Sequence, residues 1–165
     1  MAQREAAQQE VIGLRLSSRE HPRVLVVHQA LLVAQVLAGA LADQPELARV
    51  TPSDDVEGAL RAAVATDVLV LDASVRGRDG SSPLGAFLAL PVPPLVVVLG
   101  EPEGDPVAAL LAGVRAWVPQ DASLDQLGVA VREVAAGHVW MPTRLYAEVV
   151  ERLVQAGGWP PRAAG

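Results

Sequence analysis

Three short runs rich in Val and Leu constrain the fold of this chain more than any other feature. They are RVLVV at 23–27, DVLVLD at 67–72 and LVVVLG at 95–100. None of them alternates apolar with polar residues along its core, which indicates strands buried on both faces, as in a parallel sheet. Weaker patterns predict two more strands, around 47–50 and at 115–118.

Helical patterns separate the predicted strands. They fall at 30–41, 56–64, 84–90, 104–112 and 123–136. Strands that alternate with helices through short loops predict an α/β fold: a doubly wound five-stranded parallel sheet with the flavodoxin-like order 2-1-3-4-5. Gly113 and Ser123 are residue types expected at a helix end and a helix start. Asp54 and Glu57 have the spacing of a capping box.

Composition divides the chain into four parts. Residues 1–22 form a polar N-terminal extension, and residues 23–138 hold the predicted α/β domain. An extra C-terminal amphipathic helix within 139–156 follows, starting near Pro142, and residues 157–165 have the composition of a linker or tail. The apolar stripe of that helix could pack on the domain or form a symmetric dimer seam through Val149, Val150, Leu153 and Val154.

Charge, cysteine content and missing motifs exclude several kinds of site. The formal net charge is −6, and most of the arginines are isolated, so the sequence offers no basic stripe for nucleic-acid phosphates. Without cysteine, disulfides, thiolate zinc sites and cysteine nucleophiles are excluded. No signal-peptide core occurs, and no apolar run approaches the roughly twenty residues that span a bilayer. We therefore expect a cytoplasmic protein without membrane contact.

Two segments carry a resemblance to a known family. TDVLVLDASVRGRDG, at 66–80, resembles the phosphoacceptor segment of two-component receiver domains. AGVRAWVPQDASLDQLGVAVREVAAGHVWMP, at 112–142, resembles the last strand and helix of LuxR/NarL-type response regulators. The resemblance extends over residues 23 to about 155. It implies that Asp72, at the end of the third strand, matches the aspartate that accepts the phosphoryl group.

The resemblance also implies that most of the phosphorylation site is lost. In the family, two acids after the first strand hold Mg²⁺, and a hydroxyl residue and a lysine bind the phosphoryl oxygens. Here the acid positions match His28 and Gln29, the hydroxyl position matches Gly100 and the lysine position matches Gln120. A lone carboxylate is a poor Mg²⁺ site. We therefore expect a vestigial phosphoacceptor at Asp72, with no catalytic residue, no metal and no cofactor.

Other residues near this site leave alternatives open. Trp117 matches the family's switch aromatic, and it could pack over the gap left by Gly100 or be a half-exposed strand residue. His28 could be a base or a metal ligand, but the simpler interpretation is that it makes a local hydrogen bond at the strand end. Arg76 and Arg78 could supply positive charge by pairing with Asp72 or with an anion.

Three functions are compatible with these features of the sequence. The first is a non-catalytic, atypical receiver domain of a response-regulator transcription factor, which acts by dimerisation or by binding a ligand or partner. The second is a conventional receiver, phosphorylated at Asp72 by a histidine kinase with Mg²⁺. The third, a flavodoxin-like nucleotide or cofactor domain, is disfavoured because no phosphate loop and no GxGxxG motif occur.

We expect the first function. It implies a homodimer and a small-molecule ligand as a further partner, and it restricts DNA binding to an output domain that this chain does not contain. The linker-like composition of 157–165 favours a fragment of a longer regulator over a stand-alone receiver.

Overall fold

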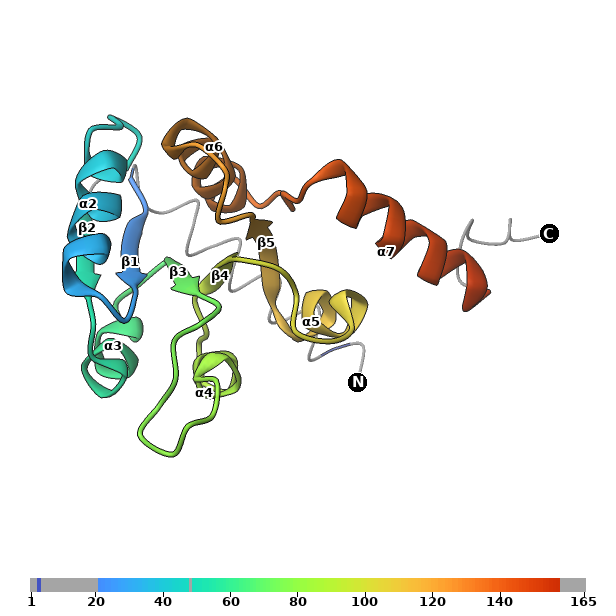
Figure 1. Cartoon of the computed structure of the whole chain (residues 1–165), viewed down its shortest axis with the longest axis horizontal. Helices are drawn as coiled ribbons and strands as arrows, with labels where there is room; N and C mark the ends of the chain where they lie inside the picture. Colours follow the sequence, from blue (N-terminus) through green and yellow to red (C-terminus); the bar gives the residue numbers. More distant parts are fainter. Residues whose placement is uncertain (1–2, 4–20, 48, 158–165) are drawn as a thin grey trace.

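The computed structural model describes residues 3, 21–47 and 49–157. These residues form three layers, with a parallel sheet of five strands between two layers of helices (Figure 1). The strand order is β2-β1-β3-β4-β5, and every pairing is parallel, which confirms the predicted topology. The predicted N-terminal extension and C-terminal tail lie almost wholly outside the described residues.

All the predicted strands and helices of the domain are present, with boundaries shifted by a few residues. The strands are β1 (Arg23–Val27), β2 (Arg49–Ser53), β3 (Val68–Asp72), β4 (Leu95–Leu99) and β5 (Val114–Val118). The helices are α2 (Leu31–Ala42), α3 (Val56–Ala63), α4 (Leu84–Leu88), α5 (Pro106–Ala112), α6 (Leu124–Ala135) and α7 (Thr143–Gln155).

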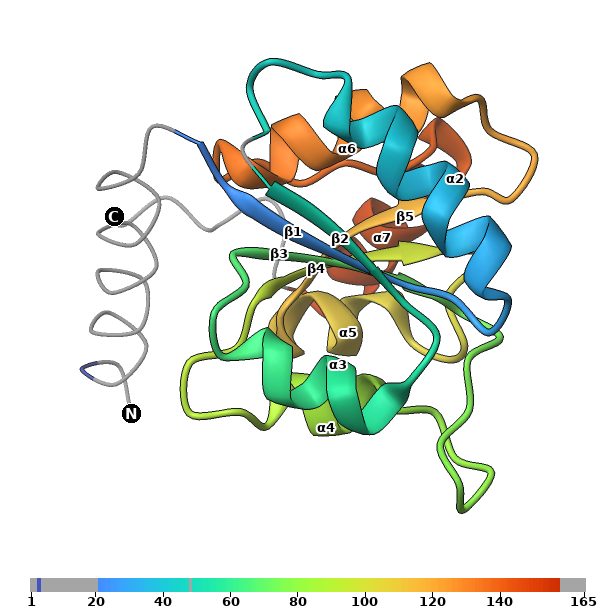
Figure 2. The ribbon, with the colours of Figure 1, turned by 90° about the vertical axis from the view of Figure 1, so that its left-hand side faces the viewer.

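The Val- and Leu-rich strands are buried on both faces because helices cover both sides of the sheet. Helices α2 and α6 lie on one side, and α3, α4 and α5 lie on the other (Figure 2). Along β1, Val24 and Val26 pack toward α2 and α6, whereas Leu25 and Val27 pack toward the opposite layer. Strands β3 and β4 are buried at every position. The edge strand β2 is more exposed and contains Pro52, which an edge tolerates.

Local capping explains several helix boundaries, with one correction to the predicted residues. Ser123 and Gln126 form the capping box that starts α6. Gly113, with a φ of 127°, ends α5 in a conformation that favours glycine. The capping-box assignment of Asp54 was wrong, because Asp55 is the residue whose carboxylate accepts hydrogen bonds from the first-turn amides of α3. The capping residue is therefore one position later than the spacing suggested, while the helix starts at Val56 as predicted.

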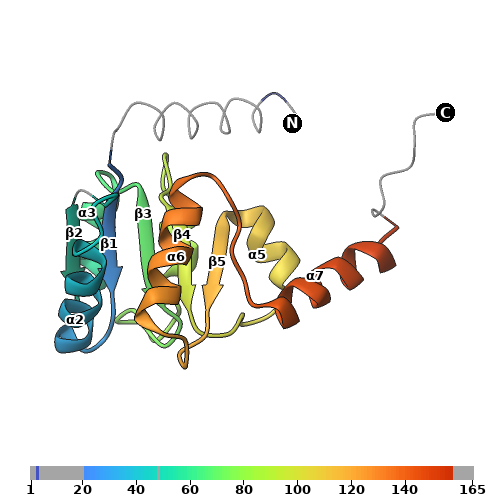
Figure 3. The ribbon, with the colours of Figure 1, turned by 90° about the horizontal axis from the view of Figure 1, so that it is seen from above.

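Helix α7 is attached to the domain mainly through its N-terminal half. Trp140 forms an isolated parallel bridge with Ala116 beside β5, and α7 then leaves the sheet on the α5 side (Figure 3). Leu145 and Val149 are buried. Of the residues expected in a dimer seam, Val149 thus packs on the domain, while Val154 is exposed. No helix among the described residues has the length and apolarity to cross a membrane.

Candidate functional site

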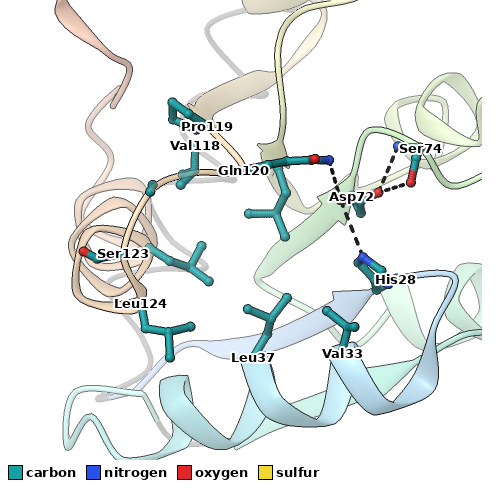
Figure 4. A pocket seen from close by; sticks show the side chains of 13 residues that line it. His28, Val33, Leu37, Asp72, Ser74, Val118, Pro119, Gln120, Ser123 and Leu124 are labelled. Atoms are coloured by element: carbon teal, nitrogen blue, oxygen red, sulfur yellow. Dashed lines mark hydrogen bonds and ion pairs between the residues drawn. The ribbon is translucent and has the colours of Figure 1, made fainter.

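Asp72 lies at the carboxyl edge of the sheet, where the strand order reverses between β1 and β3. Its side chain is only 4% exposed. Beside it is a pocket of about 440 Å³ with a polar end and apolar walls (Figure 4). The lining residues are His28, Val33, Leu37, Asp72, Ser74, Leu99, Val118, Pro119, Gln120, Ala122, Ser123, Leu124 and Leu127.

Ser74 holds one oxygen of the Asp72 carboxylate. Its backbone N–H donates to Asp72 Oδ2 at 3.0 Å, and its hydroxyl donates to the same oxygen. Ser74 was not among the residues predicted from the sequence. The available signal was its position two residues after an aspartate, the spacing at which a carboxylate can accept from a downstream amide.

Gln120 approaches the other oxygen of Asp72. Its Nε2 donates to Asp72 Oδ1 at 3.4 Å. The structure thus places Gln120 on the carboxylate, where the resemblance puts the family's lysine. An amide can donate a hydrogen bond there, but it brings no positive charge.

His28 also faces Asp72 Oδ1, with its Nε2 at 3.8 Å. Its Nδ1 accepts a hydrogen bond from the backbone N–H of Ala30 at 3.0 Å, which is the local bond expected at the strand end. With Nδ1 engaged by the main chain, His28 turns its Nε2 toward Asp72.

Gln29 is turned away from the carboxylate. Its Nε2 donates to the backbone carbonyl of Ser74 and lies 3.4 Å from the Ser74 hydroxyl. This contact ties the end of β1 to the loop after β3. Neither residue after β1 thus offers a carboxylate oxygen.

These side chains do not fit Mg²⁺. That ion prefers an octahedral set of oxygen ligands, usually including one or two carboxylates. Asp72 supplies the carboxylate, while His28 turns an imidazole nitrogen toward it and Gln29 uses its amide on Ser74. Within the part of the chain that the structure describes, no three His, Asp or Glu side chains gather into a potential metal site.

Gly100 is fixed as glycine by the fold itself. Its φ is +128°, a value that side-chain-bearing residues rarely adopt. A Cβ at this position would lie 2.9 Å from the Cβ of Ala73, the residue after Asp72. In this backbone conformation the Ala73 side chain therefore leaves no room for the hydroxyl residue that the family carries here.

Trp117 matches neither of the two interpretations given to it. It is 2% exposed, so it is not a half-exposed strand residue. The atoms within 4 Å of a Cβ on Gly100 belong to Ala73 and Gln120, so Trp117 does not fill that gap. The indole packs instead in the core on the α3–α5 side of the sheet. Its role as a switch residue stays a prediction.

Arg76 and Arg78 do not pair with Asp72 in the structure. Arg76 pairs with Glu103 at 3.0 Å, and Arg78 pairs with Glu57 at 3.5 Å. The hydrogen bonds that the Asp72 carboxylate accepts come from the amide and hydroxyl of Ser74 and the amide of Gln120, none of which carries a charge.

Comparison with solved structures gives the context of this geometry. The chain is similar to the signal receiver domain of the response regulator NarL from Mycobacterium tuberculosis, with 26% identity and a TM-score of 0.60 over 73% of this chain and 100% of that one. A LuxR-family two-component response regulator from Aurantimonas (20% identity, TM-score 0.65) is matched over 81% of this chain and 99% of its own. A LuxR-family DNA-binding response regulator from Silicibacter pomeroyi (24% identity, TM-score 0.61) is matched over 74% of this chain and 98% of its own. No protein-family model and no curated protein matches the sequence.

Proposed function

Since this chain is a response-regulator receiver domain, similar in structure to those of the LuxR/NarL family, we propose that it signals without phosphorylation of Asp72. One observation carries the proposal. Both carboxylate oxygens of Asp72 already accept hydrogen bonds from neutral protein groups, Ser74 on one side and Gln120 on the other.

Charge explains why this arrangement disfavours phosphorylation. A phosphoryl group on a carboxylate concentrates negative charge, and receivers that react need cations to stabilise it. Here Gln120 donates from a neutral amide, no lysine lies on the carboxylate, and the nearby arginines are paired with glutamates. A phosphoryl group on Oδ1 would also have to displace the Gln120 amide, and one on Oδ2 would have to displace the Ser74 bonds, in a site that is almost fully buried.

The proposed role is a regulatory module that acts by dimerisation or by binding a ligand or partner. The pocket beside Asp72 supports ligand binding, because apolar side chains from α2 and α6 face a polar end made by Asp72 and Gln120. A neighbour from Silicibacter pomeroyi is described as a DNA-binding response regulator. We place any DNA contact of this protein in an output domain outside this chain, and its site of action in the cytoplasm.

The proposal is tested with a small phosphodonor. The purified chain is incubated with acetyl phosphate and Mg²⁺, and its intact mass is measured before and after acid treatment. We expect no phosphoryl adduct on the wild-type chain. The triple variant H28D/Q29D/Q120K, which restores two acids and a lysine around Asp72, is the positive control and is expected to gain an adduct.

The opposite result would support the conventional receiver. A stoichiometric, acid-labile adduct on the wild-type chain that disappears in Asp72→Asn would show that the neutral donors do not protect Asp72. The proposal would then fail, whatever the triple variant does.

A further inference from the structure

The loop between β4 and α5 has an unusual concentration of ion pairs. Residues 101–105, EPEGD, contain three carboxylates, and we call this segment the acidic loop. Each carboxylate pairs with a different arginine at 2.9–3.0 Å: Glu101 with Arg144, Glu103 with Arg76, and Asp105 with Arg152. These arginines come from two separate parts of the chain, the segment after Asp72 and helix α7.

On one side, the acidic loop holds helix α7. Arg144 and Arg152 lie two turns apart on α7, and both reach this loop. Besides these pairs, α7 buries Leu145 and Val149, while most of its other side chains are exposed or half-buried. Asp105 also caps α5, because its Oδ1 accepts both the Val107 N–H and the Arg152 guanidinium. A shift of the loop would therefore change the support of α7 directly.

On the other side, the acidic loop is tied to the segment that follows Asp72. Arg76 donates to the backbone carbonyls of Ala73 and Val75, and its other terminal nitrogen pairs with Glu103. The loop also forms a wall of a second cavity of about 310 Å³, whose lining includes Asp72, Ala73 and Trp117. The same loop thus borders the surroundings of Asp72 and the base of α7.

We propose that the acidic loop couples the segment after Asp72 to helix α7, so that a change around Asp72 alters how firmly α7 is docked. Exposed ion pairs contribute little each, so a helix held by two of them and two buried side chains opens at low cost. Such coupling is measured as an effect on one side of the loop of a change made on the other. The inference concerns transmission and holds whether or not Asp72 is phosphorylated.

The test changes the Asp72 side of the loop and measures α7. Arg76→Ala removes a side chain whose hydrogen bonds and ion pair all lie outside α7. Amide hydrogen exchange of the full chain is followed by mass spectrometry, with peptides from 143–155 as the readout and peptides from β1 and β3 as the internal reference. We expect exchange in α7 to become about two- to fivefold faster, the range that corresponds to losing one surface ion pair.

Three variants make the result decisive. Arg78→Ala is the matched control, because Arg78 is on the same segment but pairs with Glu57 on α3, and it should leave α7 unchanged. Glu103→Gln breaks the same pair as Arg76→Ala while keeping the backbone contacts of Arg76, and it should reproduce the effect. The double variant R144A/R152A removes both direct pairs, together with the Arg152–Glu148 pair within α7, and should give the largest acceleration.

Two outcomes overturn the inference. In the first, R144A/R152A accelerates exchange in α7, but Arg76→Ala and Glu103→Gln behave like Arg78→Ala; the loop then holds α7 without coupling it to Asp72. In the second, R144A/R152A has no effect on α7, so the ion pairs do not hold the helix. Acceleration spread equally over β1 and β3 would indicate general destabilisation and would also count against coupling.

Discussion

The carboxylate of Asp72 and the carboxylates of the acidic loop lie near the same edge of the sheet but are held in opposite ways. Asp72 is 4% exposed and is bonded by uncharged groups. Glu101, Glu103 and Asp105 are 51–61% exposed and are paired with arginines. Burial makes the bonds of Asp72 costly to lose, whereas exposed ion pairs are weak. The first region is therefore a fixed part of the fold, and the second can move.

Gly100 lies between the two regions, and its substitution is expected to have the largest effect on the free energy of unfolding. Gly100→Ala combines an unfavourable φ with an overlap against Ala73, and we expect it to lower the free energy of unfolding by about 3 kcal/mol. Gly104→Ala is the control, because Gly104 also has a positive φ but faces open space. It should cost about 1 kcal/mol. Urea unfolding followed by circular dichroism measures both; equal losses would show that the overlap with Ala73 is relieved cheaply.

The next largest effect on stability is expected from removing the buried carboxylate of Asp72. Asp72→Ala leaves the donors of Ser74 and Gln120 without their acceptor, and it should lower the free energy of unfolding by about 2 kcal/mol. Glu103→Ala, the matched change in the exposed region, should cost less than about 1 kcal/mol. The same urea unfolding experiment compares the two variants. If Glu103→Ala proved as costly as Asp72→Ala, the contrast between a fixed and a movable region would be wrong.

The smallest expected effect is that of salt, which should change amide exchange in the exposed region and not in the buried one. Raising the salt concentration from about 0.05 M to 0.5 M screens exposed pairs far more than buried bonds. We expect amide exchange in α7 to accelerate by about twofold, while exchange in β3 stays constant. The R144A/R152A variant should lose this dependence. A salt effect that persists in that variant would assign it to something other than the two arginines.

The sequence was sufficient to predict the sheet and its order. Runs such as 68–71 and 95–99 are apolar at every position, and only a strand covered on both faces buries such a run completely. The position of Asp72 at the carboxyl edge follows from the same pattern. The placement of Gln120 on Asp72 followed from the resemblance, and the structure brings the two side chains together.

Contacts between distant residues could not be predicted. Arg76 and Glu103 are 27 residues apart and Arg152 and Asp105 are 47 apart, so no local pattern links them. The pairing of Arg76 with Asp72 is not found, because its guanidinium pairs with Glu103 on the acidic loop, while its contact with an anion stays a prediction. Neither packing interpretation of Trp117 describes the structure, because side chains alternate along β5 and its position faces the core on the α3–α5 side; its role as a switch residue stays a prediction.

We claim above all that Ser74 and Gln120 bind the two oxygens of the Asp72 carboxylate, where a working receiver binds metal and phosphate. A crystal structure tests this claim most directly. Crystals of the chain would be grown with Mg²⁺ and beryllofluoride, which mimics a phosphoryl group on aspartate. The account predicts that the Ser74 hydroxyl and the Gln120 amide remain on Asp72, with no beryllium bonded to it. Beryllofluoride attached to an Asp72 oxygen beside an ordered Mg²⁺ would contradict it.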